Sequence, residues 1–219
     1  MKFIPILCVA TGLLGGAAQA STTNLITNGD FELGNTGFTS GLTQVPFNGG
    51  AAQYNIATDP KAWFSAFASF GDHTSGTGNM MMINGSQTVG QTVWSQTVAV
   101  AQNTTYQFGG WISGLFAGSS AVTLAVNSDS LGTVTGPSTV ANWEAFGVSW
   151  QSGSATSATL SILQLSTQFG GNDYALDDLS FASTSVAPPP AAVIPLPAAG
   201  WALITALAAL VGLRRRARA

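Results

Sequence analysis

The middle of the chain is dominated by short runs in which hydrophobic and polar residues alternate. Six such runs lie between residues 91 and 181: QTVWSQTVAV (91–100), TTYQFGGWI (104–112), AVTLAVN (121–127), WEAFGVSW (143–150), ATLSILQLS (158–166) and YALDDLSF (174–181). A period of two places the hydrophobic side chains on one face of a β-strand. Gly, Asn, Ser and Asp separate the runs, as is typical of turns. The pattern therefore predicts an all-β domain built as an antiparallel β-sandwich.

The alternation also sorts the tryptophans of these runs. Trp94 and Trp150 share a face with other hydrophobic residues of their strands, which predicts that both lie in the core. Trp111 stands on the face opposite Phe108 and Ile112, so we expect it to point away from the core. The run KAWFSAFASF (61–70) has no clear period and fits either a short helix or a long loop.

The N-terminal hydrophobic run differs from the alternating middle. A basic start (Met1-Lys2) is followed by the apolar run FIPILCVATGLLGG and by the small-residue ending AAQA. This order predicts a signal peptide over residues 1–20, handled by the Sec translocon and signal peptidase. A first transmembrane helix is the alternative, but the run is short and is interrupted by Pro5 and by Gly15-Gly16.

The C-terminal hydrophobic run is followed directly by arginines. Residues 198–213 are uncharged and mostly apolar, and as a helix they would span about 24 Å, which a bilayer accommodates by local thinning. The four cations that follow would hold the C-terminus in the cytoplasm: Arg214, Arg215, Arg216 and Arg218. We expect a transmembrane helix over 198–213, capped by the Arg cluster 214–218, with the β-domain outside. A buried C-terminal helix is the alternative, but it leaves the arginine cluster unexplained.

Composition narrows the partners of the middle region. Between a domain of residues 21–182 and the C-terminal signal lies a Pro-rich linker, 183–192, whose three consecutive prolines favour an extended spacer. The domain contains all nine acidic residues of the chain but a single basic one, Lys61, and no cysteine. We therefore expect no nucleic-acid partner, because phosphate contacts require Lys and Arg.

One acidic residue stands where the pattern places hydrophobic ones. Asp177 shares a period-two face with Leu179 and Phe181, which predicts that its carboxylate points into the core. A buried carboxylate is costly unless it is paired, hydrogen-bonded or bound to a metal. The domain has no Arg, so the possible partners are backbone N–H groups, hydroxyls, Lys61 or a cation.

The C-terminal order of motif, hydrophobic helix and arginines resembles the PEP-CTERM sorting signal of exopolysaccharide-producing bacteria. The motif residues are Val193, Ile194, Pro195, Leu196, Pro197 and Ala198. They resemble the VPLPA-type variant, since Leu196 stands where the name-giving triplet has Glu. The resemblance implies a sorting signal over 193–219 that an exosortase processes. It further implies an exported precursor anchored in the inner membrane, with a mature form at the cell surface or outside the cell.

The two ends of the β-domain carry a second resemblance. NGDFE (28–32) near its start and LDDL (176–179) at its end are similar to the bookends of galactose-binding-like jelly rolls, such as the carbohydrate-binding modules of xylanases and cellulases. In such folds the first and last strands are neighbours, and their acidic residues often share a structural calcium ion. The resemblance implies one such ion, held by Glu32 and by Asp177 or Asp178 together with backbone carbonyls, since calcium takes several oxygen ligands.

Catalytic constellations are poorly represented in the domain. A glycosidase needs two well-placed carboxyl groups, and the only glutamates are Glu32 and Glu144, the second of which begins a strand and is expected at a rim. His73 is the only histidine, in a Gly-rich loop, and the chain has no G-x-S-x-G motif. A zinc site is not expected either, since the domain has no Cys and no second His. We expect no enzymatic activity.

Tryptophans provide the remaining candidate chemistry, because aromatic faces stack on sugar rings. Trp63, Trp111 and Trp143 are the candidates for ligand binding, with packing under a loop as the alternative for each. Our first hypothesis is a non-catalytic surface or extracellular-matrix protein that contacts exopolysaccharide. Two hypotheses compete with it: a glycan-binding module for a defined polysaccharide, and a small glycan-active hydrolase.

Overall fold

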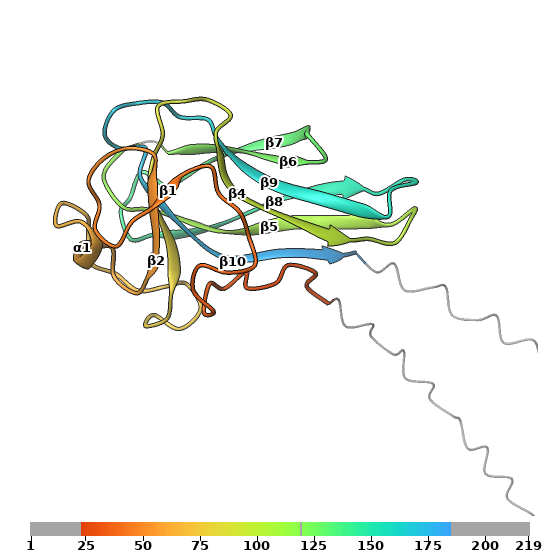
Figure 1. Ribbon diagram of the computed structural model, residues 1–219, viewed down its shortest axis with the longest axis horizontal. Coiled ribbons are helices and arrows are strands. Elements are labelled where there is room, and N and C mark those ends of the chain that lie inside the picture. Colours follow the sequence, from red (N-terminus) through yellow and green to blue (C-terminus); the bar gives the residue numbers. More distant parts are fainter. Residues whose placement is uncertain (1–22, 119, 185–219) are drawn as a thin grey trace, which may run out of the picture. The chain divides into compact units, whose positions relative to one another are not determined.

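The computed structural model describes residues 23–118 and 120–184 (Figure 1). The predicted signal peptide, the linker beyond residue 184, the sorting motif, the transmembrane helix and the Arg cluster lie outside the described residues. No helix within the described ranges combines the length and the hydrophobicity needed to cross a membrane.

Within these ranges ten strands form two sheets that face each other (Figure 1). The strands are β1 (Thr43–Gln44), β2 (Gln53–Ala57), β3 (Met80–Asn84), β4 (Thr92–Ala99), β5 (Thr105–Gly114), β6 (Ala121–Val126), β7 (Asp129–Thr135), β8 (Trp143–Gln151), β9 (Ser157–Gln164) and β10 (Tyr174–Ser183). One sheet has the order β1-β2-β3-β10-β5-β8 and the other β4-β9-β6-β7. All neighbours pair antiparallel except β1 and β2. The all-β sandwich is confirmed, and each of the six alternating runs forms a strand.

The main core lies between the two sheets and is built from the predicted hydrophobic faces. Trp94 is fully buried and Trp150 nearly so, as the alternation predicts. Phe108 of β5 and Phe181 of β10 pack edge to face with ring centroids 6.2 Å apart. Rings of this size carry much of the apolar area that stabilises a domain.

Strands without alternation were not predicted, and β3 shows the reason. Its sequence MMMIN is buried on both sides: Met81 and Ile83 contact the main core, whereas Met80 and Met82 contact a smaller second core. A strand covered on both faces is a continuous hydrophobic run and has no period of two.

The run 61–70 combines both predicted forms. A single helical turn, α1 (Pro60–Trp63), begins at the N-cap Asp59, whose Oδ1 accepts the N–H of Lys61 at 3.0 Å. The chain then continues as a loop. Trp63 and Phe67 fold onto the outer face of the six-stranded sheet, the face turned away from the four-stranded sheet, and form the second core with Met80, Met82 and neighbouring residues.

The orientation predicted for Asp177 is wrong because β10 contains a β-bulge. Its register against β5 shifts between Asp177 and Ser180, and Asp178 has a positive φ of 48°. The extra residue reverses the alternation, as bulges do. Leu179 and Phe181 therefore remain in the main core, while Asp177 pairs with Trp111 on the outer face.

Candidate functional site

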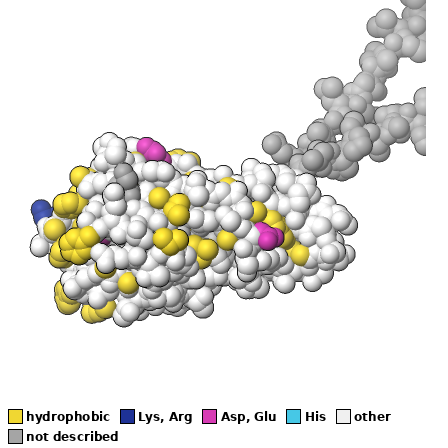
Figure 2. Space-filling view, turned by 90° about the horizontal axis from the view of Figure 1, so that it is seen from above, with side chains coloured by type: hydrophobic (Ala, Val, Ile, Leu, Met, Phe, Trp, Pro, Cys, Tyr) yellow, Lys and Arg dark blue, Asp and Glu magenta, His cyan; other side chains and the backbone are white. Residues whose placement is uncertain are grey.

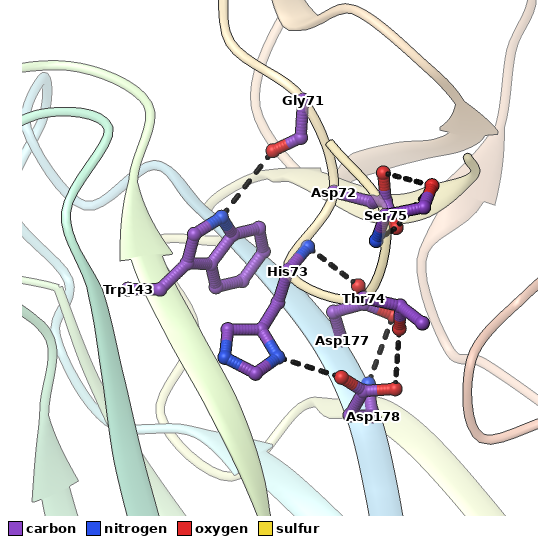
Figure 3. Close-up of polar contacts among 8 residues, drawn as sticks. All are labelled: Gly71, Asp72, His73, Thr74, Ser75, Trp143, Asp177 and Asp178. Atoms are coloured by element: carbon purple, nitrogen blue, oxygen red, sulfur yellow. Dashed lines mark hydrogen bonds and ion pairs between the residues drawn. The ribbon is translucent and has the colours of Figure 1, made fainter. Parts of the chain in front are cut away.

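Asp177 is buried on the outer face by the loop of residues 71–78. Asp177 Oδ2 accepts the backbone N–H of His73 at 2.8 Å, and Oδ1 accepts the N–H of Asp178 at 2.8 Å (Figure 3). Its side chain has no exposed surface. Of the possible partners, backbone N–H groups and not Lys61 bind the carboxylate of Asp177.

Asp178, the bulge residue, fixes the same loop through side chains. Its Oδ2 lies 2.6 Å from His73 Nδ1, and its Oδ1 accepts the hydroxyl of Thr74 at 2.6 Å (Figure 3). The contact with His73 is a hydrogen bond that becomes an ion pair when the imidazole is protonated. Asp177 therefore binds the backbone of the loop, and Asp178 binds two of its side chains.

His73 in turn covers a tryptophan on the sheet. Its imidazole stacks on the indole of Trp111 with centroids 3.8 Å apart and an interplanar angle of 17°. Trp143, from the neighbouring strand β8, meets His73 edge to face at 5.9 Å, and its Nε1 donates to the carbonyl of Gly71 at 3.3 Å (Figure 3). Trp111 and Trp143, both predicted as ligand-binding, are thus brought together, and each keeps part of its surface exposed.

A shallow groove of about 260 Å³ lies beside Trp111 on the outer face of β5, β8 and β10. We call it the outer groove. Its floor lacks side chains, because Gly109 of β5 is in register with Gly147 of β8. Its lining contains further small or polar residues: Gln107, Ala145, Asp178 and Ser180. An aromatic ring beside a flat floor with hydrogen-bonding groups is suited to an extended ligand that has apolar faces and hydroxyl edges.

The charges of the site are closely spaced and sparsely compensated. Burial raises the pKa of Asp177 to about 7, and the nearby charges of Asp178 and Asp72 act in the same direction, against the N–H donors. Burial would also raise the pKa of Asp72. Hydrogen bonds from the N–H groups of Ser75 and Gly78 outweigh this effect and hold that pKa below its ordinary value.

The carboxylates of the predicted calcium site are already hydrogen-bonded. Glu32 Oε1 accepts the N–H of Asn79 at 2.7 Å and so ties the start of the domain to the same loop. The chain segment before Glu32 runs beside β10, where the backbone N–H of Leu25 donates to the carbonyl oxygen of Phe181 at 2.8 Å. Nowhere in residues 23–118 and 120–184 do three His, Cys, Asp or Glu side chains converge to hold a metal ion. Calcium therefore stays a prediction.

Trp63 lies apart from the other two predicted tryptophans. It is buried in the second core, and its Nε1 donates to the carbonyl of Val45 at 3.1 Å. Its indole faces are therefore occupied by the protein.

A second hollow, which the sequence did not predict, lies among loops. This loop-end cavity has a volume of about 340 Å³. Five segments line it: 48–51, 64–67, 84–87, residue 116 and 168–173. Phe116 and Phe169 line it although 45% and 90% of their surfaces are exposed. Figure 2 shows hydrophobic side chains gathered at the end of the domain that carries α1 in Figure 1. Isolated phenylalanines in loops have no periodicity, so this cavity could not be predicted from the sequence.

Comparison with known proteins yields similarity of structure only. No protein-family model matches the chain, and no curated protein matches it. Among solved structures, the CBM22-1 xylan-binding domain from Paenibacillus barcinonensis Xyn10C is 16% identical with a TM-score of 0.48, covering 78% of this chain and 100% of that one. The Stig cyclase Fisc from Fischerella sp. TAU is 13% identical with a TM-score of 0.48, covering 74% and 98%.

An arabinose-bound GH51 α-L-arabinofuranosidase is 11% identical with a TM-score of 0.50. The matching region covers 77% of this chain but only 27% of the arabinofuranosidase. At such identities the likeness shows the fold alone. The function must therefore be argued from the site.

Proposed function

We propose that the β-sandwich is a non-catalytic carbohydrate-binding module that takes a neutral polysaccharide chain along the outer groove. The observation that carries the proposal is Trp111, which the stacked His73 holds in place beside the Gly109–Gly147 floor. A sugar ring in the groove can contact the indole of Trp111 and direct hydroxyls to Gln107, Asp178 or Ser180. This favours defined glycan binding over a purely structural role in a matrix.

The charge balance of the domain supports a neutral ligand. The domain has nine acidic residues, and Lys61 is its only Lys or Arg. A polyanionic glycan would therefore meet repulsion and few counter-charges. Asp178 can accept hydroxyl hydrogen bonds with the lone pairs that His73 and Thr74 leave free.

Binding isotherms of full-length protein with soluble xylan, hydroxyethyl cellulose and galactomannan test the proposal. For whichever of these polysaccharides binds, we expect Trp111→Ala to lower the affinity at least tenfold, which corresponds to about 1.4 kcal/mol. Gly147→Val should do the same by filling the groove, because a Cβ at Gly147 meets only open space and ordinary contacts. Trp63→Phe is the matched control and should leave affinity unchanged, since Trp63 is buried.

Two results would contradict the proposal. Unchanged affinity in both groove variants, at an unchanged melting temperature, would show that the groove is not the site. Release of reducing sugar that Glu144→Gln abolishes would favour the hydrolase hypothesis instead.

We also propose that the module is exported, held by the C-terminal helix and processed at Val193–Ala198 by an exosortase, so that it meets exopolysaccharide at the cell surface. The sequence signals at both ends support this part of the proposal. Mass spectrometry of the mature C-terminus from the native host is the test. A mature protein that retains Arg214–Arg218 would contradict processing.

A further inference from the structure

The loop-end cavity combines aromatic surface with amide groups. Four phenylalanines line it, and Phe64 and Phe67 pack edge to face at 5.0 Å to form one wall. Five amide side chains also line it: Asn48, Asn84, Gln87, Gln168 and Asn172. A purely apolar ligand such as an acyl chain would cover the hydrogen-bonding capacity that these amides still have, which is unfavourable. A ligand with both an apolar face and many hydroxyls would satisfy both kinds of surface.

One of these amides has a buried donor without a partner. Asn48 Oδ1 accepts the N–H of Gly50 at 3.2 Å and the side-chain amide of Asn84 at 3.2 Å. These two bonds fix the orientation of the amide, and its Nδ2 is buried with no hydrogen-bond partner. A buried unpaired donor is costly. Asn48 lines the cavity, so a ligand oxygen would remove that cost once a small turn of the side chain exposed Nδ2 to the cavity.

The charge of the cavity selects against anions. Asp173 is the only charged residue of its lining, and Asp173 Oδ1 accepts the N–H of Gly85 at 3.2 Å. A phosphate, sulfate or uronic acid would therefore meet a carboxylate and no cation. Neutral ligands with hydroxyl groups match the lining, since a carboxylate and amides together accept from and donate to hydroxyls.

We propose that the loop-end cavity is a second carbohydrate site, which takes a neutral hexopyranose unit with its apolar face on the phenylalanines and a ring or hydroxyl oxygen on Asn48 Nδ2. The cavity is lined by loops at one end of the domain, whereas the outer groove lies on strands β5, β8 and β10. The two hollows share no lining residue. A domain with both sites occupied would join two polysaccharide chains, and its apparent affinity for a polymer would exceed that of either site.

The test uses full-length protein, isothermal titration with cellohexaose, xylohexaose and mannohexaose, and variants of each site. Phe116→Ala with Phe169→Ala removes two exposed rings and should not disturb folding. Asn48→Asp keeps Oδ1 but replaces the unpartnered N–H donor with an acceptor oxygen that can carry a negative charge. Leu33→Ala is the control, because Leu33 is also largely exposed to solvent (68%) but does not line the cavity. Each variant is also made in the Gly147→Val background.

We expect two equivalents of a hexasaccharide to bind, and one in Gly147→Val. The remaining binding should weaken at least tenfold with Phe116→Ala/Phe169→Ala or with Asn48→Asp, and should not change with Leu33→Ala. Precipitation of the matching soluble polysaccharide should require both sites.

The failure of this inference differs from the failure of the proposed function, although both concern carbohydrate. If Gly147→Val abolishes all binding, the second site is refuted and the outer groove stands. If Gly147→Val changes nothing and the cavity variants abolish binding, the cavity stands and the outer groove is refuted. Unaltered binding in the cavity variants overturns the inference in either background.

Discussion

The outer groove and the loop-end cavity are two hollows of one domain, but they are built from different material. The groove lies on hydrogen-bonded strands, has a floor of glycines in register, and is bordered by an indole that an imidazole and a carboxylate hold in place. The cavity is formed by five loop segments, and its most exposed ring, Phe169, has 90% of its surface in solvent. The comparison separates a preorganised surface from one whose rings have room to adapt to a ligand.

A large effect is expected if the groove floor is as rigid as the register suggests. A Cβ at Gly109 would collide with the carbonyl oxygen of Phe146, whereas a Cβ at its register partner Gly147 would have no contact closer than 3.5 Å. We expect Gly109→Ala to destabilise the domain by about 3 kcal/mol, and Gly147→Ala to change the free energy of unfolding by less than about 0.5 kcal/mol. Chemical denaturation of both variants measures this difference. Equal stabilities would show that the strands shift readily.

The outward position of Trp111 could be predicted from the sequence, whereas the glycine floor of the groove and the cavity could not. Period-two alternation placed Trp111 outside and Trp94 inside, since burial on a strand follows from position alone. The β-bulge at Asp178 was not predicted, because its positive φ occurs at a residue that is not Gly. The stack of His73 on Trp111 joins residues 38 positions apart in sequence, and the cavity joins five loops. Such contacts depend on how the turns bring segments together, which no local pattern records.

A smaller effect compares the buried aspartates of the two regions, Asp177 near the groove and Asp173 in the cavity. Burial raises the pKa of both, of Asp177 to about 7. A group whose pKa is higher in the folded than in the unfolded state favours folding below its unfolded pKa, and this contribution is lost as pH rises through the folded value. In metal-free buffer we therefore expect stability to fall by about 2 kcal/mol between pH 5 and pH 8.

Denaturation across pH with and without Asp177→Asn measures this contribution. The stability of Asp177→Asn should depend less on pH than that of the wild type, and Asp173→Asn should reduce the dependence that remains.

Calcium sharpens the test, because an ion bound at Glu32 with Asp177 or Asp178 would stabilise the ionised form. Calcium chloride should then raise the melting temperature at pH 8, and a chelator should reverse the change. Identical curves in calcium and chelator would contradict the predicted calcium site. A wild-type stability that rises from pH 5 to pH 8 in chelator would contradict the pKa assignment.

The smallest expected effect concerns Phe169, the most exposed ring of the cavity. Because 90% of its surface is in solvent, its truncation removes little buried apolar area, and Phe169→Ala should change the free energy of unfolding by less than about 0.5 kcal/mol. Trp63→Ala, in the second core that packs beside the same cavity, should cost about 3–5 kcal/mol by comparison. Differential scanning calorimetry of the pair distinguishes rings that hold the fold from rings that only line the hollow. A loss of several degrees in Phe169→Ala would mean that the ring packs on the domain in solution, and a cavity closed by a structural ring would be as preorganised as the groove.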